Sequence, residues 1–313
     1  MKVLVTGGGG FIGSHLVEEL LKAGHEVRVL DNFSTGRREN LSGAAGRLEV
    51  GEGDVRDSAA SAAAVRGREA VCHLAALPSV PRSFRDPFSS FAVNAGGTVK
   101  VLEAARRAGV RRFIYSSSSS VYGDVEAEAK SEELEPRPLS PYAVSKLSGE
   151  SMCRLYRRVY GMETVSLRYF NVFGPRQDPR SEYAAVIPRF IQSALDGSRP
   201  TIYGDGRQTR DFTYVANVVR ANLLALAAGP EAGGGVFNIA CGEERELLDL
   251  VKALGELTGK KLEPVFEPSR AGDVRRSRAE IGRARKVLGY RPEVGWREGL
   301  EKTIAWFREI AVR

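Results

Sequence analysis

The sequence KVLVTGGGGFIG at residues 2–13 decides the fold of this chain. Residues 2–6 are typical of a short buried strand that runs straight into four glycines, and a helix with apolar residues at helical spacing follows and ends at Gly24. Glycines in such a turn let the backbone approach a pyrophosphate at the helix N-terminus, so the segment predicts a dinucleotide site. The glycines fit two registers, Gly8-Gly10-Gly13 and Gly7-Gly10-Gly13, and both remain open.

A carboxylate follows the next strand at the distance that this kind of site requires. Residues 26–30 form a second apolar strand, and Asp31 comes eighteen residues after Gly13. In dinucleotide sites an acid at this point accepts hydrogen bonds from the adenosine ribose. Asp31 favours NAD because its charge would repel the additional phosphate of NADP, whereas the nearby Arg37 and Arg38 keep NADP as an alternative.

Strands and helices then alternate, which predicts a doubly wound parallel sheet of the α/β class, as in a Rossmann domain. Further strands are expected at 48–50, 70–74, 112–115 and 164–170, with helices around 57–66, 88–108 and 142–160. Beyond residue 170 the pattern changes to shorter elements joined by Pro-, Gly- and Arg-rich loops. We therefore expect residues 1–170 to form the NAD-binding domain and 171–313 mainly a smaller α/β substrate-binding lobe, interleaved with the first.

Ligands of doubly wound sheets bind beyond the carboxyl ends of the strands. Chemically suitable groups fall at these ends, and one crevice could collect them all: Gly7–Gly13, Asp31, Asp54, Ala75-Ala76, Ser116–Ser120 and Asn171. Arginines on the loops after residue 171 suit either the gripping of phosphate or an ordinary solvated surface.

Tyr142 and Lys146 form a possible reaction centre. Ser140 and Pro141 are typical of a helix start, and a spacing of four places both side chains on one face of that helix. A phenol of pKa ~10 must lose about 3 units to act as a base near neutral pH, equivalent to about 4 kcal/mol. One cation about 5 Å away contributes ~3 kcal/mol at an effective dielectric of ~20, so a second positive charge such as an oxidised nicotinamide is needed. The alternative is a packed ring beside a lysine stem.

Composition excludes several classes of protein. The 313 residues are 42% hydrophobic and 27% charged, and no apolar run approaches the ~20 residues of a membrane helix. The N-terminus lacks the pattern of a secretory signal, so a cytoplasmic protein is expected. The net charge of +7 is dispersed, which argues against nucleic acid. Three scattered cysteines and three histidines without ligand spacing predict no metal.

With these motifs in place, the chain resembles the extended short-chain dehydrogenase/reductases, and among them the UDP-hexose 4-epimerases. The resemblance rests on Thr6-Gly7-x-x-Gly10-x-x-Gly13, the serine block before Val121-Tyr122-Gly123, and Tyr142-x-x-x-Lys146. It continues through 167–171, Asp211-Phe212 and Arg270-x-Gly272-Asp273. Segments 78–83, 183–188 and 272–277 are similar to the subgroup that prefers UDP-N-acetylglucosamine (UDP-GlcNAc) and UDP-N-acetylgalactosamine.

The resemblance implies an NAD that is reduced and reoxidised within one turnover, while the sugar passes through a 4-keto intermediate. Tyr142 would take the proton of the sugar 4-hydroxyl, Lys146 would hold the nicotinamide ribose and lower the tyrosine pKa, and Ser118 would relay the proton. UDP-GlcNAc and UDP-glucose would both be epimerised. Helices near 88–108 and 142–160 would pair into a homodimer, with surplus apolar residues at Val99, Leu102, Leu147, Met152 and Leu155.

The same resemblance implies two sets of contact residues. Those for NAD are Gly7, Gly10, Phe11, Ile12, Gly13, Asp31, Asn32, Ser34, Thr35, Gly36, Asp54, Val55, Leu74, Ala75, Ala76, Asn94, Ser116, Tyr142, Lys146 and Tyr169. Those for the UDP-sugar are Ser118, Ser119, Ser120, Asn171, Val186, Tyr203, Arg210, Arg270, Asp273 and Ser277. The small Ser277 would leave room for an acetamido group at the sugar C2.

Departures from the family pattern leave alternatives open. Pro78 stands where many relatives carry a cofactor-contacting lysine, and Ser119 or Ser120 could take the role of Ser118. Nucleotide-sugar dehydratases have an Asp-Glu couple where this chain has Ser119-Ser120, and decarboxylases commonly have a glutamate in that region. A reductase using exchangeable NADPH and a non-catalytic NAD-sensing regulator are the other hypotheses, although a sensor needs no proton relay.

Overall fold

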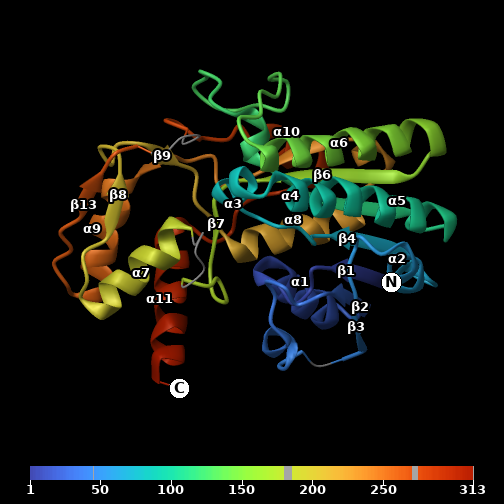
Figure 1. The fold of residues 1–313 in the computed structure, drawn as a ribbon, viewed down its shortest axis with the longest axis horizontal. Helices are drawn as coiled ribbons and strands as arrows, with labels where there is room; N and C mark the ends of the chain where they lie inside the picture. The colour runs from blue at the N-terminus through green and yellow to red at the C-terminus, as the bar shows by residue number, and fades with distance from the viewer. Residues whose placement is uncertain (45, 180–184, 270–273, 313) are drawn as a thin grey trace.

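A parallel seven-stranded sheet forms the centre of the protein, in a computed structural model that describes residues 1–44, 46–179, 185–269 and 274–312. The strand order is β11-β6-β5-β4-β1-β2-β3, and every neighbouring pair is parallel. The chain therefore winds outward from β1 in one direction and then in the other, so the expected doubly wound Rossmann fold is confirmed (Figure 1). These strands are β1 (Lys2–Thr6), β2 (Glu26–Asp31), β3 (Leu48–Glu52), β4 (Ala70–His73), β5 (Arg112–Ser118), β6 (Glu163–Tyr169) and β11 (Val236–Ile239).

Helices cover both faces of this sheet because successive strand residues point to opposite sides. Val3 and Val5 of β1 pack into the core that contains α1 (Phe11–Lys22) and α8 (Val215–Ala227). Leu4, between them, packs into the opposite core with α2 (Ser58–Val65), α5 (Thr98–Arg107) and α6 (Pro141–Tyr160). The inner strand β1 is thus apolar on both faces, as the interior of a parallel sheet requires.

The single helix expected over residues 88–108 is instead divided into α4 (Pro87–Phe91), η2 (Ala92–Gly97) and α5, and the short helix α3 (Val80–Arg85) precedes them. Helices α3 and α4 lead into η2, a π-helical turn, before α5 begins. Asn94 lies in this turn and clamps Leu77, whose N–H and carbonyl are 2.8 Å and 3.3 Å from its amide atoms. This tertiary contact and the glycines of η2 account for the interruption of the α-helix.

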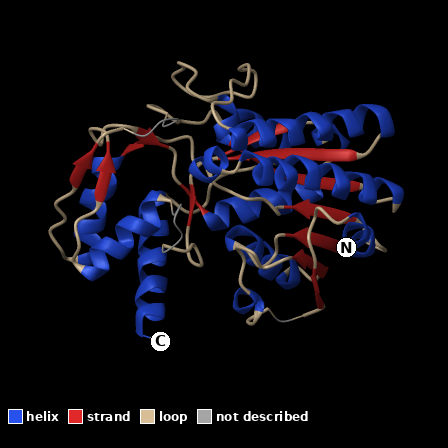
Figure 2. Cartoon of the chain, viewed as in Figure 1, coloured by secondary structure: helices blue, strands red, loops and turns tan. Residues whose placement is uncertain are grey.

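The smaller part of the molecule lies on the left of Figure 1 and is almost entirely built after residue 171. Figure 2 shows its helices packed beside short strands and long loops. Its elements are β7 (Val172–Phe173), α7 (Val186–Asp196), β8 (Thr201–Tyr203), β9 (Thr209–Arg210), β10 (Thr213–Tyr214), β12 (Arg245–Glu246), α9 (Leu247–Thr258), β13 (Val265–Glu267) and α11 (Trp296–Val312). Residues beyond 171 also return to the main sheet as α8, β11 and α10 (Gly282–Leu288), so both parts share this segment.

The remaining described elements are single 3₁₀ turns at η1 (Arg38–Leu41), η3 (Ser119–Tyr122) and η4 (Pro230–Ala232). None of the helices that the structure describes is both long and apolar enough to cross a membrane. Across the same residues, no group of three or more His, Cys, Asp or Glu side chains is arranged to hold a metal ion.

Candidate active site

A cavity of about 1440 Å³ runs along the carboxyl edge of the sheet. The connections that follow β1 and β4 leave the sheet in opposite directions, and a doubly wound fold has a crevice at this point. The predicted residues meet there. The cavity is lined by every predicted NAD residue except Asn94, together with Ser118, Ser119, Ser120, Asn171, Arg210 and Ser277. Asn94 is buried behind the wall because its amide is used by Leu77 and by Ser145.

The glycine turn adopts the register Gly7-Gly10-Gly13. Gly7 has a φ of +72°, and a Cβ there would lie 2.7 Å from the Ala75 nitrogen in the loop that follows β4. A Cβ on Gly13 would lie 2.1 Å from the Gly7 carbonyl oxygen. These three glycines line the cavity at the amino end of α1, whereas Gly8 packs against Val29. The resulting cradle of backbone beside a helix N-terminus fits a pyrophosphate.

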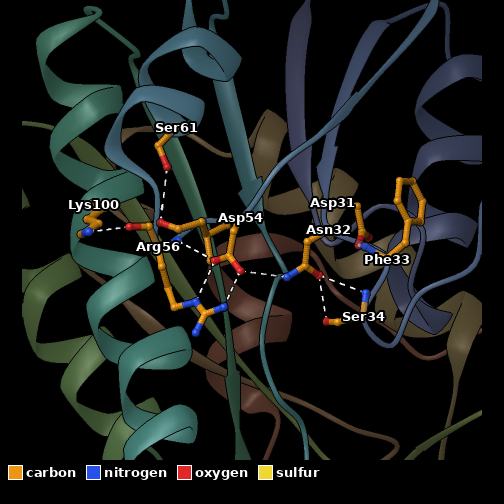
Figure 3. Close-up of polar contacts among 9 residues, drawn as sticks. Asp31, Asn32, Phe33, Ser34, Asp54, Arg56, Ser61 and Lys100 are labelled. Carbon is orange, nitrogen blue, oxygen red and sulfur yellow. Dashed lines mark hydrogen bonds and ion pairs between the residues drawn. The ribbon is translucent and has the colours of Figure 1, made fainter.

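The acid after β2 organises the loop beside this cradle. Asp31 Oδ2 accepts the Gly9 N–H at 2.8 Å, and its Oδ1 accepts the Phe33 N–H at the same distance. Figure 3 shows the next link, where the Asn32 amide donates to Asp54 Oδ2 at 2.9 Å. Two hydrogen bonds from Arg56 hold that carboxylate and help to lower the pKa of Asp54 to about 2. Two carboxyl groups held by hydrogen bonds, those of Asp31 and Asp54, therefore line the cavity at the ends of β2 and β3.

The two arginines that kept NADP open are both engaged with carboxylates. Arg37 Nη2 lies 2.7 Å from Asp178, and Arg38 pairs with Glu52 while its guanidinium covers the Phe33 ring. A ribose phosphate at Asp31 would meet a carboxylate rather than a free guanidinium, so this geometry favours NAD.

The reaction centre forms where the end of β5 meets the start of α6. Ser140 caps the helix by accepting the Ala143 N–H at 3.1 Å, and Pro141 occupies its first turn. Lys146 Nζ donates to the Ser116 carbonyl at 2.7 Å and lies 5.9 Å from the centre of the Tyr142 ring. The Ser118 hydroxyl accepts the Ser120 N–H at 3.2 Å and acts to lower the pKa of the neighbouring Tyr142. The sequence-predicted Ser118, Tyr142 and Lys146 are therefore brought together.

Burial shifts the pKa values of both Tyr142 and Lys146 in the protein without cofactor. Burial raises the pKa of Tyr142, and only the hydrogen bond from Ser118 opposes it. Burial also lowers the pKa of Lys146 to about 8, although the carboxylate of Glu150 acts against this shift. The lowering of the tyrosine pKa by Lys146 stays a prediction for the enzyme with NAD bound, whereas burial dominates in the protein without cofactor. Tyr142 is a neutral hydroxyl there.

The predicted substrate residues divide between this cavity and a smaller one. The second cavity, of about 260 Å³, shares Asn171 and Arg210 with the first and is also lined by Val186 and Tyr203. Asn171 adopts a φ of +29°, at the strand end where the two cavities meet. Arg210 donates to the Val274 carbonyl at 2.7 Å, on the segment that carries Ser277. Arg270 and Asp273 lie outside the described residues.

Residues 174–178, which we call the strap, border the cavity. The sequence analysis did not predict this position. Gln177 and Asp178 line the cavity. The strap is fixed to α1 by an ion pair between Arg176 and Glu18 and by a hydrogen bond of 3.0 Å between His15 Nε2 and the Pro175 carbonyl. Arg176 is one of the loop arginines for which phosphate binding and an ordinary surface position were both open, and it is a structural partner of α1. Its φ of +69° was not readable from the sequence.

Two other lining residues were not anticipated. Lys130 comes from the acidic, proline-rich segment 124–138, which we call the flap, and Tyr122 comes from the turn just before it. Lys130 is almost fully buried, and its backbone pairs with residues 278 and 280. Only the pairing of the flap with this distant segment brings Lys130 to the cavity, and no local signal could have indicated it.

Residues 3–240 match the NAD dependent epimerase/dehydratase family, and the chain belongs to this family. It is an enzyme of the epimerase type whose cofactor is NAD.

Three proteins that are similar to this chain match it along their whole length. The UDP-glucose 4-epimerase of Mycolicibacterium smegmatis is 43% identical over 312 residues, 98% of this chain and 99% of that protein. The UDP-glucose 4-epimerase of Thermotoga maritima, solved with UDP-glucose, has a TM-score of 0.94 and 41% identity over 99% of this chain and 100% of that one. The UDP-N-acetylglucosamine 4-epimerase of Methanobrevibacter ruminantium has a TM-score of 0.94 and 37% identity, covering 99% and 98%.

Proposed function

We propose that this protein is a UDP-hexose 4-epimerase that interconverts UDP-GlcNAc with UDP-N-acetylgalactosamine and UDP-glucose with UDP-galactose. The observation that carries the proposal is the meeting of Ser118, Tyr142 and Lys146 at one point of a cavity that continues from the glycine cradle into a second pocket. A dinucleotide and a nucleotide sugar can thus approach the same reactive groups.

The residues of the chain would divide the proton chemistry among them. NAD, when bound, supplies a hydride acceptor and a positively charged ring. Tyr142 would remove the proton from the sugar 4-hydroxyl, and Ser118, which lines the same part of the cavity, would relay it. Lys146 holds the ribose beside Tyr142 and adds a second positive charge when protonated. The 4-keto sugar turns within the cavity, and Tyr142 returns the proton after reduction from the other face.

Other residues would hold the rest of the substrate. Asn171 and Arg210 lie where the two cavities join, the position suited to a diphosphate. Tyr203 and Val186 line the smaller pocket, which suits a planar base with apolar surroundings. Ser277 lines the larger cavity and would face the sugar C2 substituent. Arg270 and Asp273 remain expected contacts on sequence grounds.

A dehydratase or decarboxylase is the second candidate, and the cavity favours it less. Ser119 and Ser120 line the cavity beside Ser118. A dehydratase would require an Asp-Glu couple at this point, and a decarboxylase commonly has a glutamate in this region. Neither hydroxyl can protonate a leaving hydroxyl at neutral pH as a carboxylic acid does.

The direct test is to incubate the purified protein separately with UDP-GlcNAc, UDP-glucose and UDP-glucuronic acid, without added cofactor. NMR should reveal the 4-epimers of the first two sugars. A product that has lost water or carbon dioxide, or a strict need for added NADPH, would contradict the proposal.

The role of Ser277 can be tested through substrate selection. Replacing Ser277 with Tyr should lower kcat/KM for UDP-GlcNAc about ten- to a hundredfold, because forcing an acetamido group into a filled pocket costs about 1 to 3 kcal/mol. UDP-glucose, with only a hydroxyl at C2, should be little affected. Equal losses for both substrates would remove Ser277 from substrate selection.

A further inference from the structure

Glu150 lies on the same face of α6 as Tyr142 and Lys146, at successive intervals of four residues. Its side chain is completely buried, and it pairs with Arg168 of β6, which is 2% exposed. The guanidinium donates to both carboxylate oxygens, with Nε 2.8 Å from Oε1 and Nη2 2.7 Å from Oε2. Because a buried pair can often be replaced by apolar residues without loss of stability, stability alone does not explain it.

The carboxylate of Glu150 also holds the strand that carries the serines. Three consecutive residues of β5 each contact one member of the α6 face, so a single strand register orders the whole reaction centre. A close approach of the two elements makes this matching tight, since a Cβ on Gly149 would lie 2.2 Å from the Tyr115 hydroxyl oxygen. Lys146 Nζ donates to the Ser116 carbonyl at 2.7 Å, and Ser117 Oγ donates to Glu150 Oε1 at 2.5 Å. The next residue, Ser118, lies beside Tyr142 and acts to lower its pKa.

We propose that Glu150 is a positioning residue for the epimerase reaction: it fixes the end of β5 against α6 through Ser117 and supplies the negative charge one helical turn from Lys146. The inference rests on the roles proposed above for Ser118, Tyr142 and Lys146. Arg168 balances the carboxylate from the opposite side, so the charge is held in place without attracting Lys146 away from the cavity.

The electrostatic part of this role has a definite sign. Glu150 raises the pKa of Lys146, whereas burial lowers it, with a result of about 8. Removing the anion therefore lowers the lysine pKa further, and Lys146 loses its proton at a lower pH. The decline of kcat at high pH should move in the same direction. The titratable or charged groups that face Lys146 or Glu150 are Tyr142 and Cys153 on α6, Tyr115 on β5, His73 on β4 and Arg168 on β6.

Three variants separate positioning from charge. Ser117→Ala removes the hydroxyl bridge and keeps all charges, so kcat should fall about 3- to 10-fold with KM and the pH profile nearly unchanged. Ser117→Thr keeps the hydroxyl and should restore the rate. Glu150→Gln removes the charge as well, so kcat should fall about 10- to 100-fold and the high-pH limb should move to lower pH.

The matched control is Glu163→Gln. Glu163 of β6 forms an ion pair of 2.6 Å with Arg112 of β5. This pair lies at the amino ends of the two strands, away from the cavity. Its loss should lower stability and leave kcat and the pH profile unchanged.

Turnover of UDP-GlcNAc by the wild type establishes the proposed function independently of these variants. An epimerising wild type whose Ser117→Ala and Glu150→Gln forms keep normal kcat and pH profiles would overturn this inference alone. If Glu150→Gln does not fold, the Ser117 pair still decides it, since equal rates for Ala and Thr exclude positioning through Ser117.

Discussion

In the proposed mechanism Tyr142 must give up a proton although its position is desolvated, and these two properties ordinarily oppose each other. Burial raises the pKa of Tyr142, so the protein without cofactor keeps the phenol neutral. The positive charge needed to ionise it must come from the bound cofactor together with Lys146. The proton acceptor is then generated only when the cofactor is in place.

Tyr142→Phe should lower kcat by ~10² to 10⁴, because it removes only the hydroxyl that transfers the proton. The fold and NAD content should persist, since the ring remains between the same neighbours. Absorbance of the purified variant measures the cofactor, and NMR of the sugar products measures turnover. A variant that retains nearly normal turnover would exclude Tyr142 from the mechanism.

Individual residues also mark how far the sequence could predict the site. The strand-end residues were found because parallel strands bring their carboxyl ends to one edge, whatever the loop conformation. The sequence could not show which of the two glycine registers is used, because the choice depends on the close approach of Gly7 to the Ala75 backbone in the loop after β4. Asn94 was misplaced for the same reason, as its partners Leu77 and Ser145 are distant in sequence.

At the scale of elements, the strap joins the two parts of the molecule above the cofactor cavity. Its ion pair between Arg176 and Glu18 is only 20% exposed on each side, whereas Arg37 and Asp178 are 63% and 39% exposed. Exposed pairs contribute about 0.2 to 1 kcal/mol, so the contact at Glu18 should be the stronger. The strap arises from long-range contacts, which is why the sequence pattern suggested only a loop.

Glu18→Gln should therefore speed the release of bound cofactor. Loss of the ion pair frees the strap from α1 and opens that side of the cavity, and we expect release at least about fivefold faster, equivalent to about 1 kcal/mol. Fluorescence of the reduced cofactor during exchange measures the rate. Glu19→Gln is the control, because Glu19 forms an ion pair with the exposed Lys22 on the same helix. Identical rates for both variants would show that the strap does not retain the cofactor.

A second connection between elements is made by Asp211. Its buried carboxylate accepts the N–H groups of Cys241, Gly242 and Ala279 at 2.9, 3.0 and 3.2 Å. One side chain thus joins the end of β9 to the turn after β11 and to the segment that follows Ser277. Burial nevertheless raises the pKa of Asp211 to about 7.

Asp211→Asn should destabilise the protein by about 1 to 3 kcal/mol, because the amide nitrogen cannot accept an N–H. It should also flatten the pH dependence. The folded pKa lies above the ordinary 3.8, so the folded protein binds a proton that the unfolded chain releases, and this contribution to stability falls as pH rises from about 4 to 7. Denaturant unfolding at about pH 5 and pH 8 measures both effects. A wild type and variant with the same pH slope would refute the titration of Asp211.

At the scale of the whole molecule, one side carries an apolar surface. α3, α4 and α6 lie together and expose large side chains, of which Phe88 is 86% exposed. The residues are Phe84, Phe88, Phe91, Val144, Leu155, Val159 and Tyr160. Of the five residues that the sequence analysis suggested for a dimer interface, Leu155 is exposed on this surface, whereas Leu102 is a core residue with no exposure. Helical periodicity does not distinguish the two faces of a helix that are both apolar.

The homodimer stays a prediction, and this surface gives it a specific form. Phe88→Glu should convert a dimer into a monomer, because it places a charge in an apolar interface. Light scattering at micromolar concentration measures the mass. Phe266→Glu is the control, since Phe266 is 51% exposed on β13 in the other part of the molecule. A wild-type monomer mass would count against the dimer.

The return of the chain to the main sheet has a consequence for its biosynthesis. β11, the strand at one edge, is contributed by residues 236–239 and pairs with β6, which ends at residue 169. A growing chain that stops at residue 170 leaves β6 with a row of unpaired N–H and carbonyl groups, and such edges associate with other chains. The apparent dinucleotide domain is therefore unsuited to independent expression. On the ribosome the sheet is completed only after about three-quarters of the protein has been made.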